Sequence, residues 1–157
     1  MGRSMIDSRA KGARAERAAA EYLSAITGRV WYRTAQRCGT DTADVRSDGV
    51  PLHVEVKHYA SGLSYWARRS EGLRLSLGGE LLFCRADHLP RVALQREDHH
   101  VAPRSILCEG FMRQAVRDCA PLAIPMVLAR QNNSHWVAIW RLSDDDAFSE
   151  IWRGFHA

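Results

Sequence analysis

The feature of the sequence that most constrains its fold is VPLHVEVKHY at residues 50–59, in which apolar and charged residues alternate. Alternation of this kind is typical of a β-strand, because successive side chains point to opposite faces of a sheet. Val54 and Val56 then face one side, and Glu55 and Lys57 lie together on the other. Two explanations fit this charged face: an ion pair on a solvated sheet, or part of a functional site.

The residues before this strand predict a helix and two further strands. An Ala-, Arg- and Glu-rich segment at 8–26 is typical of a helix, and Gly28 is a plausible stop. RVWYRT at 29–34 and ADVRS at 43–47 are predicted as strands. The SDG turn at 47–49 leads directly into the alternating strand, so we expect a compact antiparallel meander packed against the helix.

The second half of the chain predicts one more helix and two closing strands. Helical spacing extends over about 108–119, and strand patterns follow at 123–130 and 135–141. The acidic stretch after them fits a solvated tail or a final short helix, and residues 61–110 form an insert with no clear pattern. The order α-β-β-β-α-β-β predicts one α/β domain over residues 1–157, with a mixed sheet of about five strands flanked by helices.

The composition excludes several classes of protein. The chain is 46% apolar and 25% charged, as in ordinary globular proteins, and it has no run of about 18 apolar residues that could cross a membrane. The first residues, MGRSMIDSRAKG, lack the apolar region of a secretory signal, so we expect a cytoplasmic protein, in the host cytoplasm if a phage encodes it. Four cysteines without a CxxC pair suggest neither a zinc site nor a disulfide framework.

Nearly all of the basic residues are arginines. A net charge of +4 and a pI of about 9.1 favour a polyanionic partner. Of the 22 basic residues, only Lys11 and Lys57 are lysines. Genomic base composition could explain the excess of arginine, but a lysine that persists against such a bias suggests a chemically required ammonium group.

A second carboxylate is expected close to Glu55. Asp44 lies at the start of the preceding strand, and antiparallel pairing through the SDG turn can bring it within reach of Glu55, with Lys57 on the same face. Two facing carboxylates repel unless a cation lies between them. Their hard oxygen ligands suit Mg²⁺ or Mn²⁺, which typically bind one or two carboxylates together with substrate phosphate oxygens. A lysine beside such an ion can help to deprotonate the attacking water or neutralise developing negative charge.

A third carboxylate, Glu16, falls on or beside the buried face of the predicted first helix. An edge residue that bends out to solvent would give the same pattern. Two other acids are rivals for these positions. Asp41 lies in a polar turn and could replace Asp44, although Asp44 opens the strand with apolar flanks; Glu21 lies about 140° from Glu16 around the helix.

Two of these patterns resemble one nuclease superfamily. ADV at 43–45 followed by EVK at 55–57 looks like the D…(D/E)xK signature of PD-(D/E)xK nucleases, with Ala43 where the family often has proline. KGARAERAAAEYL at 11–23 resembles the KGxxxER first helix of Holliday junction resolvases of the archaeal and phage type. That helix supplies a glutamate to the active site, and Glu16 is the position that matches.

A third segment is similar to phage resolvase-like nucleases, in which a helix carrying Gln-Ala precedes two closing strands. It runs from 113 to 140 as RQAVRDCAPLAIPMVLARQNNSHWVAIW. In total the resemblance covers 10–60 and 111–141 and leaves 61–110 without a counterpart.

The resemblance implies a restriction-endonuclease-like core that hydrolyses DNA phosphodiester bonds to a 5′ phosphate and a 3′ hydroxyl. The catalytic residues would be Glu16, Asp44, Glu55 and Lys57. The three carboxylates would bind Mg²⁺, with Mn²⁺ able to substitute, and Gln114 would position a phosphate or a metal-bound water.

Contacts with DNA are expected from basic and aromatic side chains near the acids, although each could also be ordinary surface or core edge. The candidates are Lys11, Arg14, Arg17, Arg33, Arg37, Trp66, Arg68, Arg69 and Gln114.

The expected activity is the resolution of four-way Holliday junctions by symmetric nicking. Because a junction is cut in two strands and each chain has one set of acids, a homodimer with twofold symmetry is expected. The alternatives are a related nuclease acting on flaps, ends or duplex DNA in repair, recombination or restriction, and a nuclease-fold protein that binds DNA without cutting it.

Overall fold

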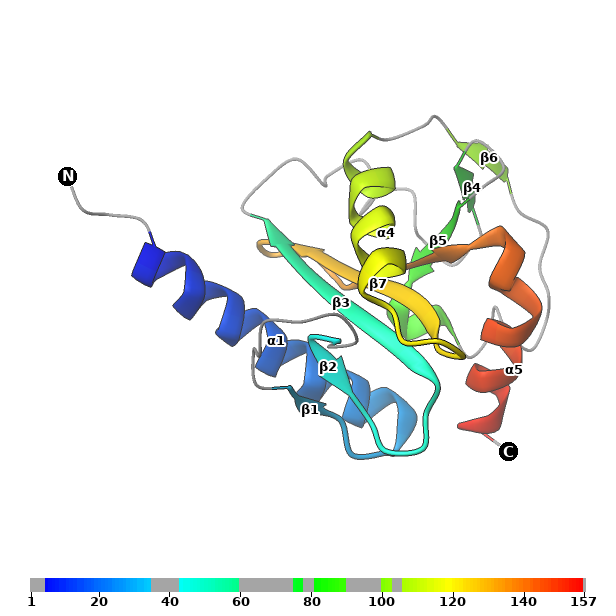
Figure 1. Ribbon diagram of the computed structural model, residues 1–157, viewed down its shortest axis with the longest axis horizontal. Helices are drawn as coiled ribbons and strands as arrows, with labels where there is room; N and C mark the ends of the chain where they lie inside the picture. The colour runs from blue at the N-terminus through cyan, green and yellow to red at the C-terminus, as the bar shows by residue number, and fades with distance from the viewer. Residues whose placement is uncertain are drawn as a thin grey trace.

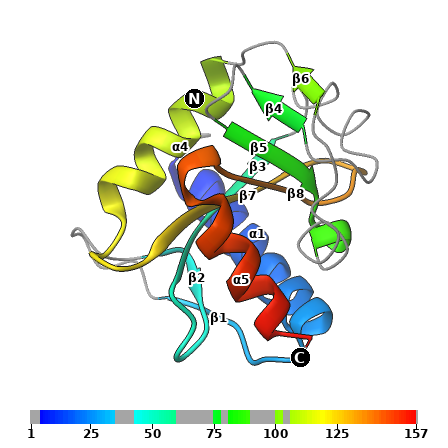
Figure 2. The ribbon, with the colours of Figure 1, turned by 90° about the vertical axis from the view of Figure 1, so that its right-hand side faces the viewer.

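The computed structural model describes residues 5–34, 43–59, 75–77, 81–89, 100–102 and 106–156. In this part of the chain a single mixed sheet of eight strands lies between helices (Figure 1, Figure 2). The strands are β1 (Tyr32–Arg33), β2 (Val45–Arg46), β3 (Leu52–Tyr59), β4 (Leu75–Leu77), β5 (Leu81–Arg85), β6 (His100–Ala102), β7 (Ile124–Gln131) and β8 (Val137–Arg141). Their order across the sheet is β1-β2-β3-β7-β8-β5-β4-β6.

The helices cover both faces of this sheet. Helices α1 (Met5–Thr27) and α5 (Asp145–Gly154) contribute to the core on one face, and α4 (Ile106–Asp118) packs on the other. Two short 3₁₀ turns, η1 (Ala86–His88) and η2 (Leu142–Asp144), follow β5 and β8. No helix among the described residues is long and apolar enough to cross a membrane.

The predicted meander after the first helix is confirmed. The backbone leaves α1 at Gly28, whose φ of 68° lies in the left-handed region that glycine adopts without strain. β1 pairs with β2 and β2 with β3, both antiparallel. Gly49, with a φ of 75°, makes the turn between β2 and β3, as the SDG sequence predicts.

The long central strand β3 is enclosed on all sides. It pairs in parallel with β7 along its whole length, from Leu52 opposite Ile124 to Tyr59 opposite Gln131. Because it lies between β2 and β7 and has helices over both faces, residues 52–55 are buried regardless of the face they occupy. Glu55 is therefore a buried carboxylate, 3% exposed, and not a solvated surface residue.

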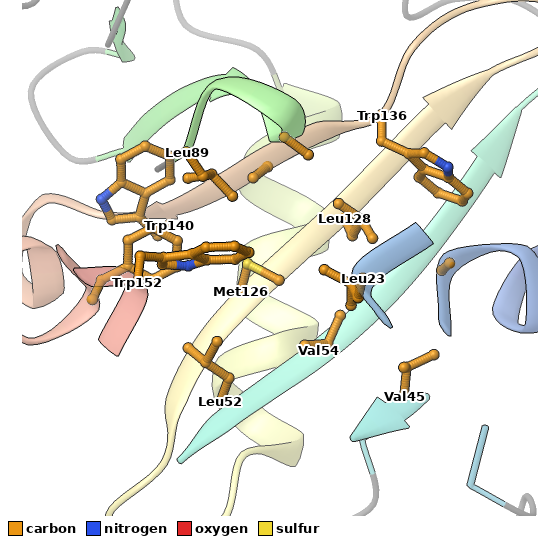
Figure 3. Packing of buried hydrophobic residues seen from close by; sticks show 14 of the residues in the cluster. Leu23, Val45, Leu52, Val54, Leu89, Met126, Leu128, Trp136, Trp140 and Trp152 are labelled. Atoms are coloured by element: carbon orange, nitrogen blue, oxygen red, sulfur yellow. The ribbon is translucent and has the colours of Figure 1, made fainter. Parts of the chain in front are cut away.

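The main hydrophobic core lies between the sheet and the pair α1 and α5. Figure 3 shows Leu23 of α1 and Trp152 of α5 reaching the same face as Met126 and Leu128 of β7. At the α5 end, the rings of Trp140 and Phe148 stack with their centroids 4.5 Å apart. A second cluster on the other face packs Phe111, Met112 and Ala115 of α4 against the sheet.

Two fold predictions need correction. The sheet has eight described strands and not about five, because the insert adds β4, β5 and β6 beyond β8. β5 is a continuous apolar run, Leu81 to Cys84, that is buried on both faces and so lacks alternation. The acidic stretch near the end is not a solvated tail: it contains the first turns of α5, with Phe148 and Trp152 fully buried, so the helix alternative is the correct one.

Candidate active site

The register of β2 against β3 brings Asp44 opposite Glu55. Val45 pairs with Val54, so the residue before Val45 faces the residue after Val54. The main chain of Asp44 is fixed on both sides: its N–H donates to the carbonyl of Val54 at 2.9 Å, and its carbonyl accepts from the N–H of Thr34 at 3.1 Å. The predicted approach of the two carboxylates is thus a direct result of strand pairing.

The side chain of Asp44 continues the ladder where β2 begins. Its Oδ2 accepts a hydrogen bond from the N–H of Val56 at 2.8 Å. This main-chain donor lies on β3 just beyond the paired residues, so the carboxylate takes the place of a further strand residue. This bond holds the Asp44 carboxylate beside β3, close to Glu55.

The pKa of Asp44 reflects the charges of two other carboxylates. Burial and the negative charge of Glu55 raise the pKa of Asp44 from 3.8 to about 7, the charge of Glu16 adds to the rise, and the Val56 N–H opposes it. Glu16, Asp44 and Glu55, which lie on α1, before β2 and on β3, are therefore gathered at one place. Such a cluster favours either a shared proton or a bound cation.

The same face of β3 carries His53 and Lys57, each two residues from Glu55. The Nε2 atom of His53 lies 2.9 Å from Oε1 of Glu55, and the two side chains are 2% and 3% exposed. The ammonium of Lys57 donates to Oε1 of Gln114 on α4 at 2.7 Å, and it lies 5.7 Å from the centre of the Phe111 ring. α4 therefore holds the lysine in place above the strand.

Glu16 is neutralised by an arginine. It is 5% exposed on the buried side of α1, and its Oε2 accepts a hydrogen bond from Nε of Arg33 on β1. The prediction placed Arg33 among the DNA contacts; the structure pairs it with an acid of the cluster.

Two cavities open beside the acids. One of about 320 Å³ has Lys11 and Glu16 of α1 and Lys57 of β3 in its wall. The other, of about 670 Å³, has Arg33 and His53 in its wall. Each cavity thus adjoins side chains that belong to the cluster or are hydrogen-bonded to it, and each is lined in part by basic groups.

The remaining predicted DNA contacts fall in three groups. Arg14 and Arg17 are exposed on α1, outside the buried face that carries Glu16. Four candidates lie outside the described residues: Arg37, Trp66, Arg68 and Arg69. Gln114 accepts the hydrogen bond from Lys57 and so contacts the candidate site on β3.

Sequence reasoning missed His53. The alternation that pairs Glu55 with Lys57 applies equally in the other direction along the strand, and it places the residue two positions before Glu55 on the same face. That signal was present in VPLHVEVKHY, but a histidine beside apolar neighbours is easily taken for core.

The donor set fits a small, hard cation bound by two carboxylates. Among the described residues no group of three or more His, Cys, Asp or Glu side chains is arranged to hold a metal ion. Asp44 and Glu55 nevertheless face each other, and Mg²⁺ needs only one or two carboxylates when water and substrate phosphate supply its other ligands. Burial is the largest cause of the raised pKa of Asp44, and the charge of Glu55 is the next; a cation between the two acids would offset both.

No protein-family model matches the chain, and no curated protein or solved structure shows significant similarity to it.

Proposed function

We propose that the protein is a divalent-metal-dependent endonuclease with a restriction-endonuclease-like core, which resolves four-way Holliday junctions by symmetric nicking. The observation that carries the proposal is the pairing of Asp44 with Glu55, with Lys57 on the same face of β3. A buried carboxylate next to a half-buried one that repels it is costly to a fold. Their presence beside an anchored lysine fits a metal-dependent hydrolase, in which a bound cation offsets this cost.

Each residue has a defined task in this reaction. Asp44 and Glu55 would hold Mg²⁺, or Mn²⁺ in its place, and Glu16 is the third carboxylate, with Arg33 balancing its charge. Held there, the ion would supply Lewis-acid chemistry, lowering the pKa of the attacking water and polarising the scissile phosphate. Lys57, fixed by Gln114, orients the attacking water or neutralises the charge that develops on phosphorus-bound oxygens. Water oxygen bonds to phosphorus as the bond to the 3′ oxygen breaks, which leaves a 5′ phosphate and a 3′ hydroxyl.

The substrate is proposed from charge and geometry. Lys11 lines the cavity that contains Glu16 and Lys57, and Arg14 and Arg17 are exposed on the same helix, so phosphates can be bound beside the acids. The net charge of +4 supports a polyanionic substrate. Because the described part of one chain has one such cluster and a junction needs two cuts, a homodimer is the proposed assembly. The proposed location is the cytoplasm of a cell or of a phage host.

A second candidate keeps the same chemistry on other DNA. The cluster gives no reason by itself to prefer a junction over flaps, ends or duplex, so a repair, recombination or restriction nuclease is the alternative. Comparing cleavage of a four-way junction, a flap and a linear duplex separates the two, because only a resolvase makes paired symmetric nicks.

The test of the activity is cleavage of a synthetic four-way junction in Mg²⁺. Asp44→Asn, Glu55→Gln and Lys57→Ala are expected to lower the rate by at least about 100-fold, the scale of a lost catalytic group. Glu150→Gln, at an exposed position of α5, is the matched control and should cut as the parent does. If the three site variants cut as fast as the parent protein, the proposed active site is wrong. If the folded parent protein does not cut any of the DNA substrates in Mg²⁺, a DNA-binding protein without activity takes the place of the proposed nuclease.

A further inference from the structure

The contact between His53 and Glu55 points to a role that the proposed function does not yet include. Nε2 of His53 and Oε1 of Glu55 are 2.9 Å apart, a normal hydrogen-bond distance, and both side chains are almost fully enclosed. They project from the same face of β3 two residues apart, so the strand itself sets their separation.

A histidine at this position is unfavourable for packing alone. Position 53 is 3% exposed, and the neighbouring residues of β3, Leu52 and Val54, are apolar. A buried imidazole costs free energy unless its nitrogens find partners, and an aliphatic side chain would fill the space without that cost. Its partner is a carboxylate, which in turn needs a donor when it is ionised and buried.

The geometry also assigns the two oxygens of Glu55 to different tasks. Oε1 is held by the imidazole, so the carboxylate cannot rotate freely about its last torsion. Asp44 lies opposite Glu55 across the strand pair. With Oε1 held by His53, the second oxygen of Glu55 is left to bind a cation between Glu55 and Asp44.

We propose that His53 is a positioning residue that orients the Glu55 carboxylate for cation binding. The inference rests on the proposed function, because it treats Glu55 as a metal ligand. Partners that orient a metal ligand from outside the coordination sphere commonly change metal affinity by about 10- to 100-fold when they are removed. His53 does so by donating from Nε2, and it does not touch substrate.

The test measures Mn²⁺ affinity by titration calorimetry and electron paramagnetic resonance, apart from any cleavage. His53→Leu is expected to raise the Mn²⁺ Kd by about 10-fold or more. His53→Gln places an amide N–H near the position of Nε2 and should restore most of the affinity, whereas the shorter His53→Asn should behave like the leucine variant. His88→Leu, on η1, is the control and should bind Mn²⁺ like the parent.

Thermal melting in EDTA establishes that each variant is folded, and if His53→Leu fails to fold, the comparison of Gln with Asn still decides. Equal Mn²⁺ affinity in the parent, the leucine variant and the asparagine variant would overturn the positioning role while leaving the nuclease proposal intact. An equal loss of Mn²⁺ affinity in the leucine, glutamine and asparagine variants would show that donation from Nε2 is not the basis of the positioning role. A parent protein that neither binds Mn²⁺ nor cleaves DNA would overturn the proposed function, and this inference with it.

Discussion

The carboxylate of Asp44 accepts a hydrogen bond from the main-chain N–H of Val56 at 2.8 Å, and this bond turns it towards Glu55 on the neighbouring strand. A main-chain donor normally stabilises an ionised carboxylate, yet the pKa of Asp44 is raised to about 7. Burial and the charges of Glu55 and Glu16 outweigh the donor. The surroundings of Asp44 therefore disfavour the ionised form of its carboxyl group.

The raised pKa of Asp44 predicts how the free energy of unfolding depends on pH in the absence of metal. Between about pH 4 and 7 an unfolded chain loses the Asp44 proton while the folded protein keeps it, so this group destabilises the fold progressively as pH rises towards 7. Asp44→Asn has no such titration and keeps an oxygen for the Val56 N–H. We expect its melting temperature in EDTA to exceed that of the parent by a margin that grows from pH 4 to pH 7. Asp146→Asn, exposed on α5, is the control; a margin that does not change with pH would contradict the prediction.

Addition of a divalent cation should offset the destabilisation that the ionised Asp44 carboxylate causes. A cation between Asp44 and Glu55 binds the folded state, and at about ten times its Kd it adds about 1.4 kcal/mol to the free energy of unfolding. For a chain of this size we expect a rise in melting temperature of about 3–5 °C at pH 8 in Mg²⁺ or Mn²⁺. Asp44→Asn and Glu55→Gln should show no rise, whereas Glu150→Gln should respond as the parent does. A rise of the same size in NaCl of matched ionic strength would show that the effect is not site binding.

The bond from Lys57 to Gln114 makes a kinetic prediction. Gln114→Leu removes the acceptor that holds the ammonium at 2.7 Å, so the lysine loses its fixed position above Glu55. We expect kcat for DNA cleavage to fall by about 10-fold with little change in KM. Gln114→Glu supplies another acceptor and should recover most of the rate. Steady-state rates over a range of junction concentrations provide the measurement, and a leucine variant as fast as the parent would remove Gln114 from the site.

Lys11 should strengthen DNA binding and make the affinity depend more steeply on salt concentration. It is exposed at the rim of the cavity that contains Glu16 and Lys57, where a phosphate contact would release counterions. Lys11→Gln is expected to weaken binding and to reduce the slope of log affinity against log salt by about 0.7–0.9. Fluorescence anisotropy in EDTA measures this without cleavage. Arg153→Gln, on α5 at the opposite end of the molecule from the start of α1 (Figure 1), should leave the slope unchanged.

Local patterns in the sequence predict most of the frame that holds the acids. The SDG turn and the alternation of VPLHVEVKHY predict that Asp44 meets Glu55 with Lys57 beside it, because short antiparallel connections fix register. Helical composition and spacing predict α1 and α4 to within a few residues. These features depend on contacts between residues that are near each other in the chain.

The parts that could not be predicted depend on distant contacts. The pairing of Glu16 with Arg33 requires the docked position of α1 against β1, and no spacing rule encodes it. The insert escapes pattern analysis because β4 and β6 have only three residues each, too few for a period to be recognised. In α5, Phe148 and Trp152 are four residues apart, and this single helical pair is masked by the acidic residues before it.

The buried tryptophans of the main core also have a practical consequence. Trp31, Trp136, Trp140 and Trp152 are all at most 5% exposed. Trp140 and Trp152 lie together at the α5 end of the core, and Trp136 lies at its other end beside Tyr22 of α1 (Figure 3). Unfolding of the core would expose all four indoles to water, so a red shift of the intrinsic fluorescence would report loss of the core without any added label.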